Sequence, residues 1–206
     1  DNWEVTENNG KTSISLQKPD MEIPSVGGTD WVEHPIYYVV DGDSSIKMTS
    51  TSQESTLTYP ASRDAGLDLS NEYAFGFSMK VRNQNTRNGA NSPVVTLYTD
   101  ENNYMTFTPS DPLLFPHAYE TFTEMQYRHE WYPVNIPLEG GAGWLREVSG
   151  TPDLSNINYV SIRTQSGGTQ PLELWIDGMK TISKDSLPYY GANIAADGQE
   201  VYSSAA

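Results

Sequence analysis

The chain has 206 residues and a formal net charge of −15, from 12 basic and 27 acidic side chains, and it contains no cysteine. A negative field of this size repels phosphate backbones and anionic lipids, so nucleic acid is not expected as a partner. No run approaches the roughly 18 apolar residues of a membrane span, so membrane insertion is not expected, and the lack of cysteine excludes disulfides, thiolate metal sites and cysteine nucleophiles.

Short runs of β-branched and aromatic residues, separated by Gly, Pro, Asn and Asp, predict about ten strands. In chain order these are 12–16, 36–40, 45–51, 55–59, 73–81, 94–99, 104–108, 131–137, 159–164 and 172–176. The run 73–81 alternates apolar and small or polar residues over nine positions, which is typical of a strand with one buried face. The pattern predicts an all-β protein, a two-sheet antiparallel β-sandwich of the jelly-roll kind.

The longest predicted loops are 17–35, 82–93, 109–130 and 138–153, and loops of this length in a compact β-domain are more often functional than not. We expect a single domain over residues 1–190, followed by a C-terminal tail or linker at 191–206 that leads toward other domains of a larger protein. The composition, rich in Thr, Ser, Asn, Asp, Gly and Tyr and poor in Lys, indicates an extracellular protein, secreted or at the cell surface.

No catalytic residues are assigned. The sequence has no G-x-S-x-G nucleophile turn, and its three histidines, His34, His117 and His129, have no metal-ligand spacing. The loop 109–130 does gather Tyr, His and Arg side chains, a combination that polysaccharide lyases use. An enzyme acting on a glycan therefore remains an alternative.

Aromatic rings and hydrogen-bonding side chains recur in the second half of the chain, and together they suit a sugar. Pyranose rings stack their C–H faces on aromatic rings, while their hydroxyls bond to Asn, Asp, Gln and Arg. The candidate ligand-binding residues are Asn103, Tyr104, Tyr119, Tyr127, Arg128 and Trp144. Trp144, flanked by glycines, is expected to be exposed on a flexible loop, whereas Trp131 and Trp175 lie within predicted strands and are expected in the core.

Acidic residues near strand ends indicate a possible calcium site. Asp41 and Asp43 precede the strand 45–51, Asp177 ends the strand 172–176, and Glu4 would join them if the first and last strands pair. Calcium takes six to eight oxygen ligands from carboxylates and loop carbonyls. The alternative is an ordinary Asp-Gly turn without metal.

Three motifs in the last third of the chain resemble a known family. They are the W-Y-P-V-N-I-P-L run at 131–138, the D-L-S-N-I turn at 153–157 and the L-W-I-D strand at 174–177. Upstream, the run 41–47 resembles a G-x-x-S-L-K strand of the same family. In this order the motifs are similar to non-catalytic carbohydrate-binding modules of the galactose-binding-like β-jelly-roll type, over roughly residues 41 to 180.

The resemblance implies a module that binds a polysaccharide without changing it. It also implies a structural calcium ion held by a carboxylate of the closing strand, here Asp177, and helped by a glutamate near the first strand, here Glu4. The alternatives are a structural or adhesive exoprotein subunit of a surface layer or filament with the same fold, and a polysaccharide lyase or glycosidase.

Overall fold

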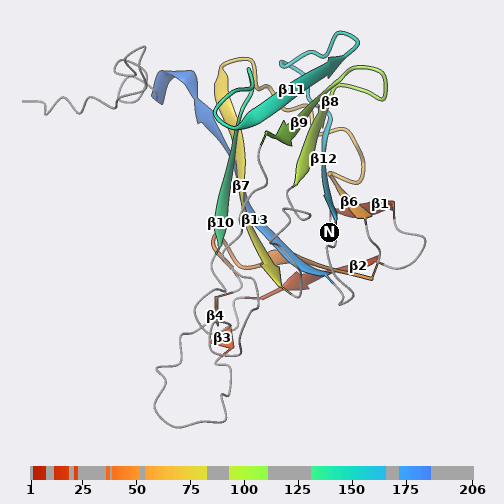
Figure 1. The fold of residues 1–206 in the computed structure, drawn as a ribbon, viewed down its shortest axis with the longest axis vertical. Helices are drawn as coiled ribbons and strands as arrows, with labels where there is room; N and C mark the ends of the chain where they lie inside the picture. Colours follow the sequence, from red (N-terminus) through yellow and green to blue (C-terminus); the bar gives the residue numbers. More distant parts are fainter. Residues whose placement is uncertain are drawn as a thin grey trace, which may run out of the picture.

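The computed structural model describes residues 2–7, 12–18, 21–22, 36–37, 39–51, 54–82, 93–110, 131–165 and 172–186, and the structural statements below concern these residues. Two antiparallel sheets face each other across the molecule (Figure 1). A single 3-10 turn, η3 (Lys184–Ser186), is the helical element of this part of the chain. Within the described ranges no helix is long and apolar enough to cross a membrane.

The first sheet, which we call sheet A, has six strands. Their order across the sheet is β1 (Glu4–Glu7), β6 (Glu54–Tyr59), β12 (Tyr159–Gln165), β8 (Val94–Tyr98), β9 (Tyr104–Pro109) and β11 (Trp144–Ser149). Every neighbouring pair is antiparallel. Strands that are distant in the sequence therefore lie side by side, and this is what assembles a surface from several parts of the chain.

The second sheet, sheet B, has five strands, and a separate pair of short strands accompanies it. The order in sheet B is β10 (Tyr132–Pro137), β7 (Glu72–Arg82), β13 (Leu172–Ser183), β5 (Ser45–Ser50) and β2 (Thr12–Gln17), while β3 (Met21–Glu22) pairs with β4 (Ile36–Tyr37). All these pairs are antiparallel too. The predicted two-sheet antiparallel sandwich is confirmed.

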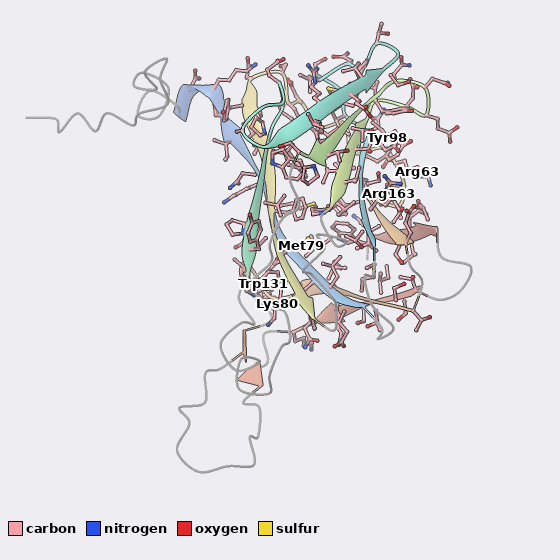
Figure 2. All side chains as sticks on the ribbon, in the orientation of Figure 1. Arg63, Met79, Lys80, Tyr98, Trp131 and Arg163 are labelled. Atoms are coloured by element: carbon pink, nitrogen blue, oxygen red, sulfur yellow. The ribbon has the colours of Figure 1, made fainter. Side chains whose placement is uncertain are left out.

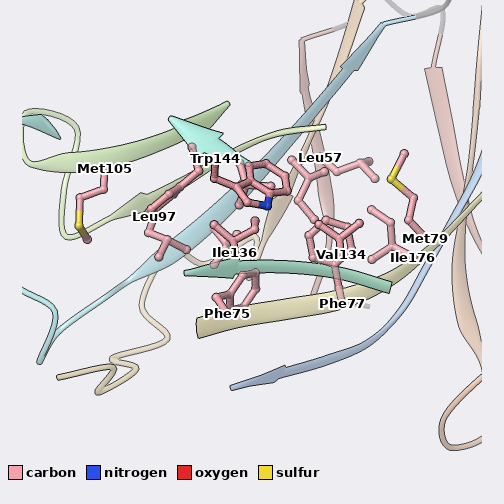
Figure 3. Close-up of a cluster of buried hydrophobic side chains, with 14 of the residues drawn as sticks. Leu57, Phe75, Phe77, Met79, Leu97, Met105, Val134, Ile136, Trp144 and Ile176 are labelled. Atoms are coloured by element: carbon pink, nitrogen blue, oxygen red, sulfur yellow. The ribbon is translucent and has the colours of Figure 1, made fainter. Parts of the chain in front are cut away.

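The core lies between the two sheets and follows from the alternation along each strand. Phe75, Phe77 and Met79 of β7 face Val95 and Leu97 of β8 in one buried cluster (Figure 3). Side chains at alternate positions of a strand point to the same face, so the intervening residues of each strand point away from the core. That second set of side chains forms the outer faces of the sandwich.

Eight of the ten predicted strands occur within one residue of their expected bounds, and a ninth, predicted at 172–176, begins where expected; the tenth, predicted at 36–40, corresponds to β4 at Ile36–Tyr37. The last strand, β13, continues to Ser183, seven residues beyond the predicted end. Three strands were missed: β1, β3 and β11. The strand β11 lies inside the predicted loop 138–153, where glycines precede it and apolar and charged residues share both faces, so the sequence has no clear period of two.

Several sequence predictions fall on residues that the structure does not describe. These include the tail 191–206, most of the loops 17–35 and 82–93, and the loop segment 111–130. The division into a domain and a tail stays a prediction.

Candidate glycan-binding face

The outer face of sheet A, the face turned away from the core, brings together side chains from all six strands. Val160 and Ile162 of β12 are in the core, so Ser161 and Arg163 between and beyond them point outward. The same alternation turns Thr96 and Tyr98 of β8 outward, because Val95 and Leu97 are buried. Figure 2 shows Tyr98, Arg63 and Arg163 on one side of the molecule, away from Trp131 and Lys80.

A row of hydroxyl side chains crosses the middle of this face. In register from β1 to β11 it runs through Glu4, Thr58, Ser161, Thr96, Thr106 and Glu147. Five strand spacings of about 4.8 Å give the row a length of roughly 24 Å, which is long enough for several sugar residues. A glutamate stands at each end of this hydroxyl row.

The hydroxyls of this row bond partly to one another. Thr96 Oγ1 lies 3.1 Å from Thr106 Oγ1, and Thr58 Oγ1 lies 3.2 Å from Thr6 Oγ1. A hydroxyl has one donor and two acceptor lone pairs, so each bonded pair keeps acceptor capacity for a further partner. The Ser and Thr side chains of this row are short and most of them are buried: 2% of Thr58 and 8% of Ser161 are exposed.

A row of three tyrosines runs beside the hydroxyl row. Tyr159 of β12 is opposite Tyr98 of β8, and Tyr98 is opposite Tyr104 of β9. The rings of Tyr98 and Tyr159 are stacked, with centroids 4.3 Å apart and 9° between their planes, and those of Tyr98 and Tyr104 are tilted by 44° at 5.2 Å. Tyr159 is buried, whereas Tyr98 and Tyr104 are half-buried and reach solvent.

An arginine extends the tyrosine row. The guanidinium of Arg63 lies 5.3 Å from the ring centroid of Tyr159, and its Nη2 and Nε donate to Glu4 Oε1 at 2.7 and 3.1 Å. The hydrogen bond to Glu4 raises the pKa of Arg63 above its ordinary value. Burial, and next the nearby Tyr98, raise the pKa of Tyr159, so both groups keep their protons at neutral pH.

A second arginine stands on the other side of the hydroxyl row. Arg163 of β12 is exposed and donates from Nη1 to Glu54 Oε1 of β6 at 3.4 Å. The face thus combines aromatic rings, hydroxyls and guanidinium groups next to carboxylates. This combination of apolar ring surface and planar hydrogen-bonding groups is what the recognition of a sugar requires.

Of the predicted ligand-binding residues, Tyr104 belongs to this face and Asn103 serves the turn before it. The amide nitrogen of Asn103 donates to both carboxylate oxygens of Asp100, at 2.9 and 2.8 Å. Its Oδ1 accepts the backbone N–H of Thr151 at 2.8 Å. Both the nitrogen and the oxygen of the Asn103 side-chain amide are therefore hydrogen-bonded to other residues of the protein. Asn103 thus joins the β8–β9 turn to the segment after β11.

The expectation that Trp144 is exposed on a flexible loop is wrong. Trp144 is the first residue of β11, only 6% of it is exposed, and its ring belongs to the main core cluster. Figure 3 shows the ring among buried side chains that include Leu97 and Ile136. The glycines that precede Trp144 suggested a flexible loop, but they form the turn that places Trp144 at the start of β11, with its ring in the core. A ring in this position has no face to offer a ligand.

The remaining predicted ligand-binding residues, Tyr119, Tyr127 and Arg128, lie outside the described residues, as do His117 and His129. Of the two tryptophans expected in the core, Trp175 is buried, with 1% exposed, and the half-buried Trp131 packs against it, but the two form a small cluster separate from the core between the sheets. Trp175 is nevertheless on the outer side of sheet B, where Lys47 Nζ and Lys80 Nζ lie 4.9 and 5.5 Å from its ring centroid.

The predicted calcium ligands do not come together as one set. Glu4 is paired with Arg63, and the carboxylate of Asp177 accepts backbone N–H groups of Val40, Asp41 and Gly178 at 2.6, 3.0 and 2.7 Å. In the described part of the chain, no three His, Cys, Asp or Glu side chains are grouped as metal ligands. Glu4, Asp41, Asp43 and Asp177 as placed here do not form one site together, and the calcium ion stays a prediction.

Two of these carboxylates do share a cavity of about 470 Å³ at the edge of the sandwich. Asp41 and Asp177 line it together with the rings of Trp3 and Tyr59, whose centroids are 5.0 Å apart. Asp43 is exposed and lies outside this lining. The cavity thus places Asn2 and Trp3 near β13, but β1 pairs with β6 in sheet A and β13 with β5 and β7 in sheet B, so the first and last strands do not pair as the inclusion of Glu4 required.

Sequence reasoning missed most of the outer face of sheet A. Tyr98, Tyr159 and Arg163 were each visible within a predicted strand, but the pairing of β8 with β12 was not. The available signal was the position of Tyr98 two residues after Thr96 and of Tyr159 two residues before Ser161, on the faces opposite the apolar residues. Only the register showed that these positions adjoin.

No family model matches the sequence, and no curated protein matches it. Among solved structures, the chain is similar to the family 11 carbohydrate-binding module of Clostridium thermocellum in complex with a β-1,3-1,4-mixed-linked tetrasaccharide. The two are 15% identical with a TM-score of 0.45, and the match covers 88% of this chain and 89% of the module.

Two further similar structures are carbohydrate-binding modules of the β-sandwich superfamily described for promiscuous specificity, and an exo-β-agarase. The first is 10% identical, with a TM-score of 0.38, over 88% of this chain and 57% of that one. The agarase is 14% identical, with a TM-score of 0.42, over 83% of this chain and 23% of the enzyme.

Proposed function

We propose that this protein is a non-catalytic carbohydrate-binding module that holds a polysaccharide on the outer face of sheet A. The observation that carries the proposal is the pair of parallel rows on this face: the tyrosines Tyr159, Tyr98 and Tyr104, and the hydroxyl row beside them. The tyrosines supply ring surface for a pyranose, and Arg63 and Arg163, with the half-buried Thr106 of the hydroxyl row, supply hydrogen bonds. A row that crosses six strands suits a chain of sugars better than a single residue.

Binding without catalysis agrees with the groups present on this face. Two of its carboxylates are engaged with arginines, Glu4 with Arg63 and Glu54 with Arg163. A glycosidase needs one carboxylic acid and one carboxylate flanking the scissile bond. These ion pairs instead favour a surface that binds a glycan without cleaving it. An extracellular location, other domains in a larger protein and a structural calcium ion are further parts of the proposal.

The proposal is tested by affinity electrophoresis and calorimetry on a panel of soluble polysaccharides, including mixed-linkage β-glucan and agarose. We expect Tyr104→Ala to weaken binding about tenfold, since an aromatic contact is worth roughly 1 kcal/mol or slightly more. Tyr104 is the half-buried end of the tyrosine row, so its ring is the one best placed to receive a sugar.

The matched control is Tyr73→Ala. Tyr73 is 39% exposed and belongs to β7 of sheet B, so its removal takes away a tyrosine that reaches solvent from the other sheet. An equal loss in both variants, or unchanged binding in Tyr104→Ala, would contradict the assignment to sheet A. A wild-type chain that binds no glycan on the panel would favour the structural or adhesive alternative, and product formation would favour an enzyme.

A further inference from the structure

The charges on the outer face of sheet A are unequal in number. Two guanidinium groups, those of Arg63 and Arg163, stand among at least four carboxylates, and these are Glu4, Glu54, Glu101 and Glu147. Glu4 and Glu147 occupy the two ends of the hydroxyl row. A polysaccharide that lies along this row therefore meets a carboxylate at either end.

Both arginines are already neutralised by carboxylates of the protein. Arg63 Nη2 is 2.7 Å from Glu4 Oε1 and Arg63 Nη1 is 3.9 Å from Glu101 Oε1, while Arg163 Nη1 is 3.4 Å from Glu54 Oε1. An anionic sugar would have to compete with these carboxylates for the same guanidinium groups. It would also meet the field of a chain whose net charge is −15.

The same ion pairs leave each guanidinium able to bond to an uncharged partner. A guanidinium has five N–H donors, and the contacts to carboxylates engage only some of them. The remaining donors can bond to sugar hydroxyls, which are neutral and are not repelled by the glutamates. The exposed Glu147 and the half-buried Thr106 opposite it offer acceptors to the hydroxyl protons of the same sugars.

We infer that the outer face of sheet A selects neutral polysaccharides and rejects those that carry sulfate or carboxylate groups. The inference rests on the proposed function, because it names the class of glycan that the same face takes. The glutamates have two effects in this arrangement. They hold the arginines in position across the face, and they repel an anionic chain that approaches it.

Matched polymer pairs test this inference at low ionic strength, where charge effects are largest. Agarose is compared with chemically sulfated agarose, and hydroxyethyl cellulose with carboxymethyl cellulose. For each backbone that binds, we expect the anionic member to bind at least about tenfold more weakly than the neutral one, and the gap to narrow as salt is added.

A variant that releases Arg163 sharpens the test. Glu54→Gln removes the carboxylate that pairs with Arg163 at 3.4 Å, so binding of the anionic member should rise several-fold relative to the neutral member. The matched control is Glu139→Gln, which releases Arg146 from an ion pair of 3.3 Å. Arg146 lies on the core side of β11 with its Nη2 next to Met105 Sδ, so this control should leave the ratio unchanged.

The outcomes separate this inference from the proposed function. If the anionic member of a pair binds as tightly as the neutral one, or more tightly, the inference is overturned while glycan binding stands. The same holds if Glu54→Gln and Glu139→Gln change the ratio equally. If neither member of either pair binds and the wider panel gives no binding, the proposed function fails and the inference with it.

Discussion

Asp177, in the middle of β13, joins this strand to the segment that leads into β5. Its Oδ2 accepts the backbone N–H groups of Val40 and Asp41, and its Oδ1 accepts that of Gly178, which has a φ of 58°. Carboxylates bonded to several backbone N–H groups are strong local anchors, because charge-assisted hydrogen bonds exceed neutral ones. The residue thus has a structural role in the absence of any metal.

We expect Asp177→Asn to lower the free energy of unfolding by about 2 kcal/mol, because one of the two accepting oxygens becomes a donor and faces N–H groups that then lack an acceptor. Urea unfolding in EDTA measures the effect without a contribution from calcium. The control is Asp43→Asn, since Asp43 is exposed and its side chain makes no hydrogen bond within the described structure. Equal stability of the two variants would contradict this role for Asp177.

Among the connections between strands, turns that begin with an aspartate recur. Asp68 Oδ1 accepts from Ser70 N and Oγ at 3.0 and 2.6 Å, and Asp153 Oδ1 accepts from Ser155 N and Oγ at 2.9 and 2.7 Å. The two D-L-S turns lie side by side, because the N–H of Leu69 donates to the carbonyl of Leu154. The sequence analysis used only the second of them, although the first has the same residues.

The β8–β9 turn is held by a third aspartate, Asp100. Hydrogen bonds from the Asn103 side chain, and next from the backbone N–H of Asn102, lower the pKa of Asp100 below its ordinary value. A carboxyl whose pKa is lower in the folded chain stabilises the fold fully above the pKa of an unfolded aspartate, near 3.9. That stabilisation is lost as the pH falls through the lower, folded value.

The expected consequence is that Asp100→Ala is less stable than wild type at pH 6, and that this difference shrinks in acid below about pH 3.9. Urea unfolding curves from pH 6 down to pH 2 measure it. Asp43→Ala serves as the control, because its side chain does not bond to a turn. A difference between wild type and Asp100→Ala that stays constant over the whole range would show that the charge of Asp100 plays no part.

The net charge acts on the whole molecule. With 27 acidic and 12 basic side chains, self-repulsion opposes the compact state at neutral pH, and salt screens it. We expect NaCl to raise the Tm in thermal unfolding. A Tm that does not respond to salt would mean that local ion pairs such as Arg63–Glu4 already balance the repulsion.

The calcium prediction is tested against this background. At equal ionic strength, CaCl2 should raise the Tm more than MgCl2, because calcium accepts the irregular oxygen sets that magnesium does not. Asp41→Asn should abolish the increment, since Asp41 lines the cavity next to Asp177. Identical curves in the two salts would reject a calcium site.

Local patterns in the sequence were sufficient for the class of fold and for most strands. The alternation of Tyr73, Phe75, Phe77 and Met79 with small or polar residues predicted β7 and its buried face, because side chains alternate along any extended strand. The same reasoning failed for β11, since an edge strand buries little on either face. Trp144 at its start was misjudged for this reason.

The sequence by itself thus determined an acidic, cysteine-free all-β chain and the face on which each strand carries its apolar residues. Tertiary structure alone decided which strands are neighbours, and with them the composition of the candidate site. Tyr98 and Tyr159 are 61 positions apart in the chain, yet their rings stack at 4.3 Å. The physical reason is that strand pairing depends on the packing of the two sheets as a whole, which no local window contains.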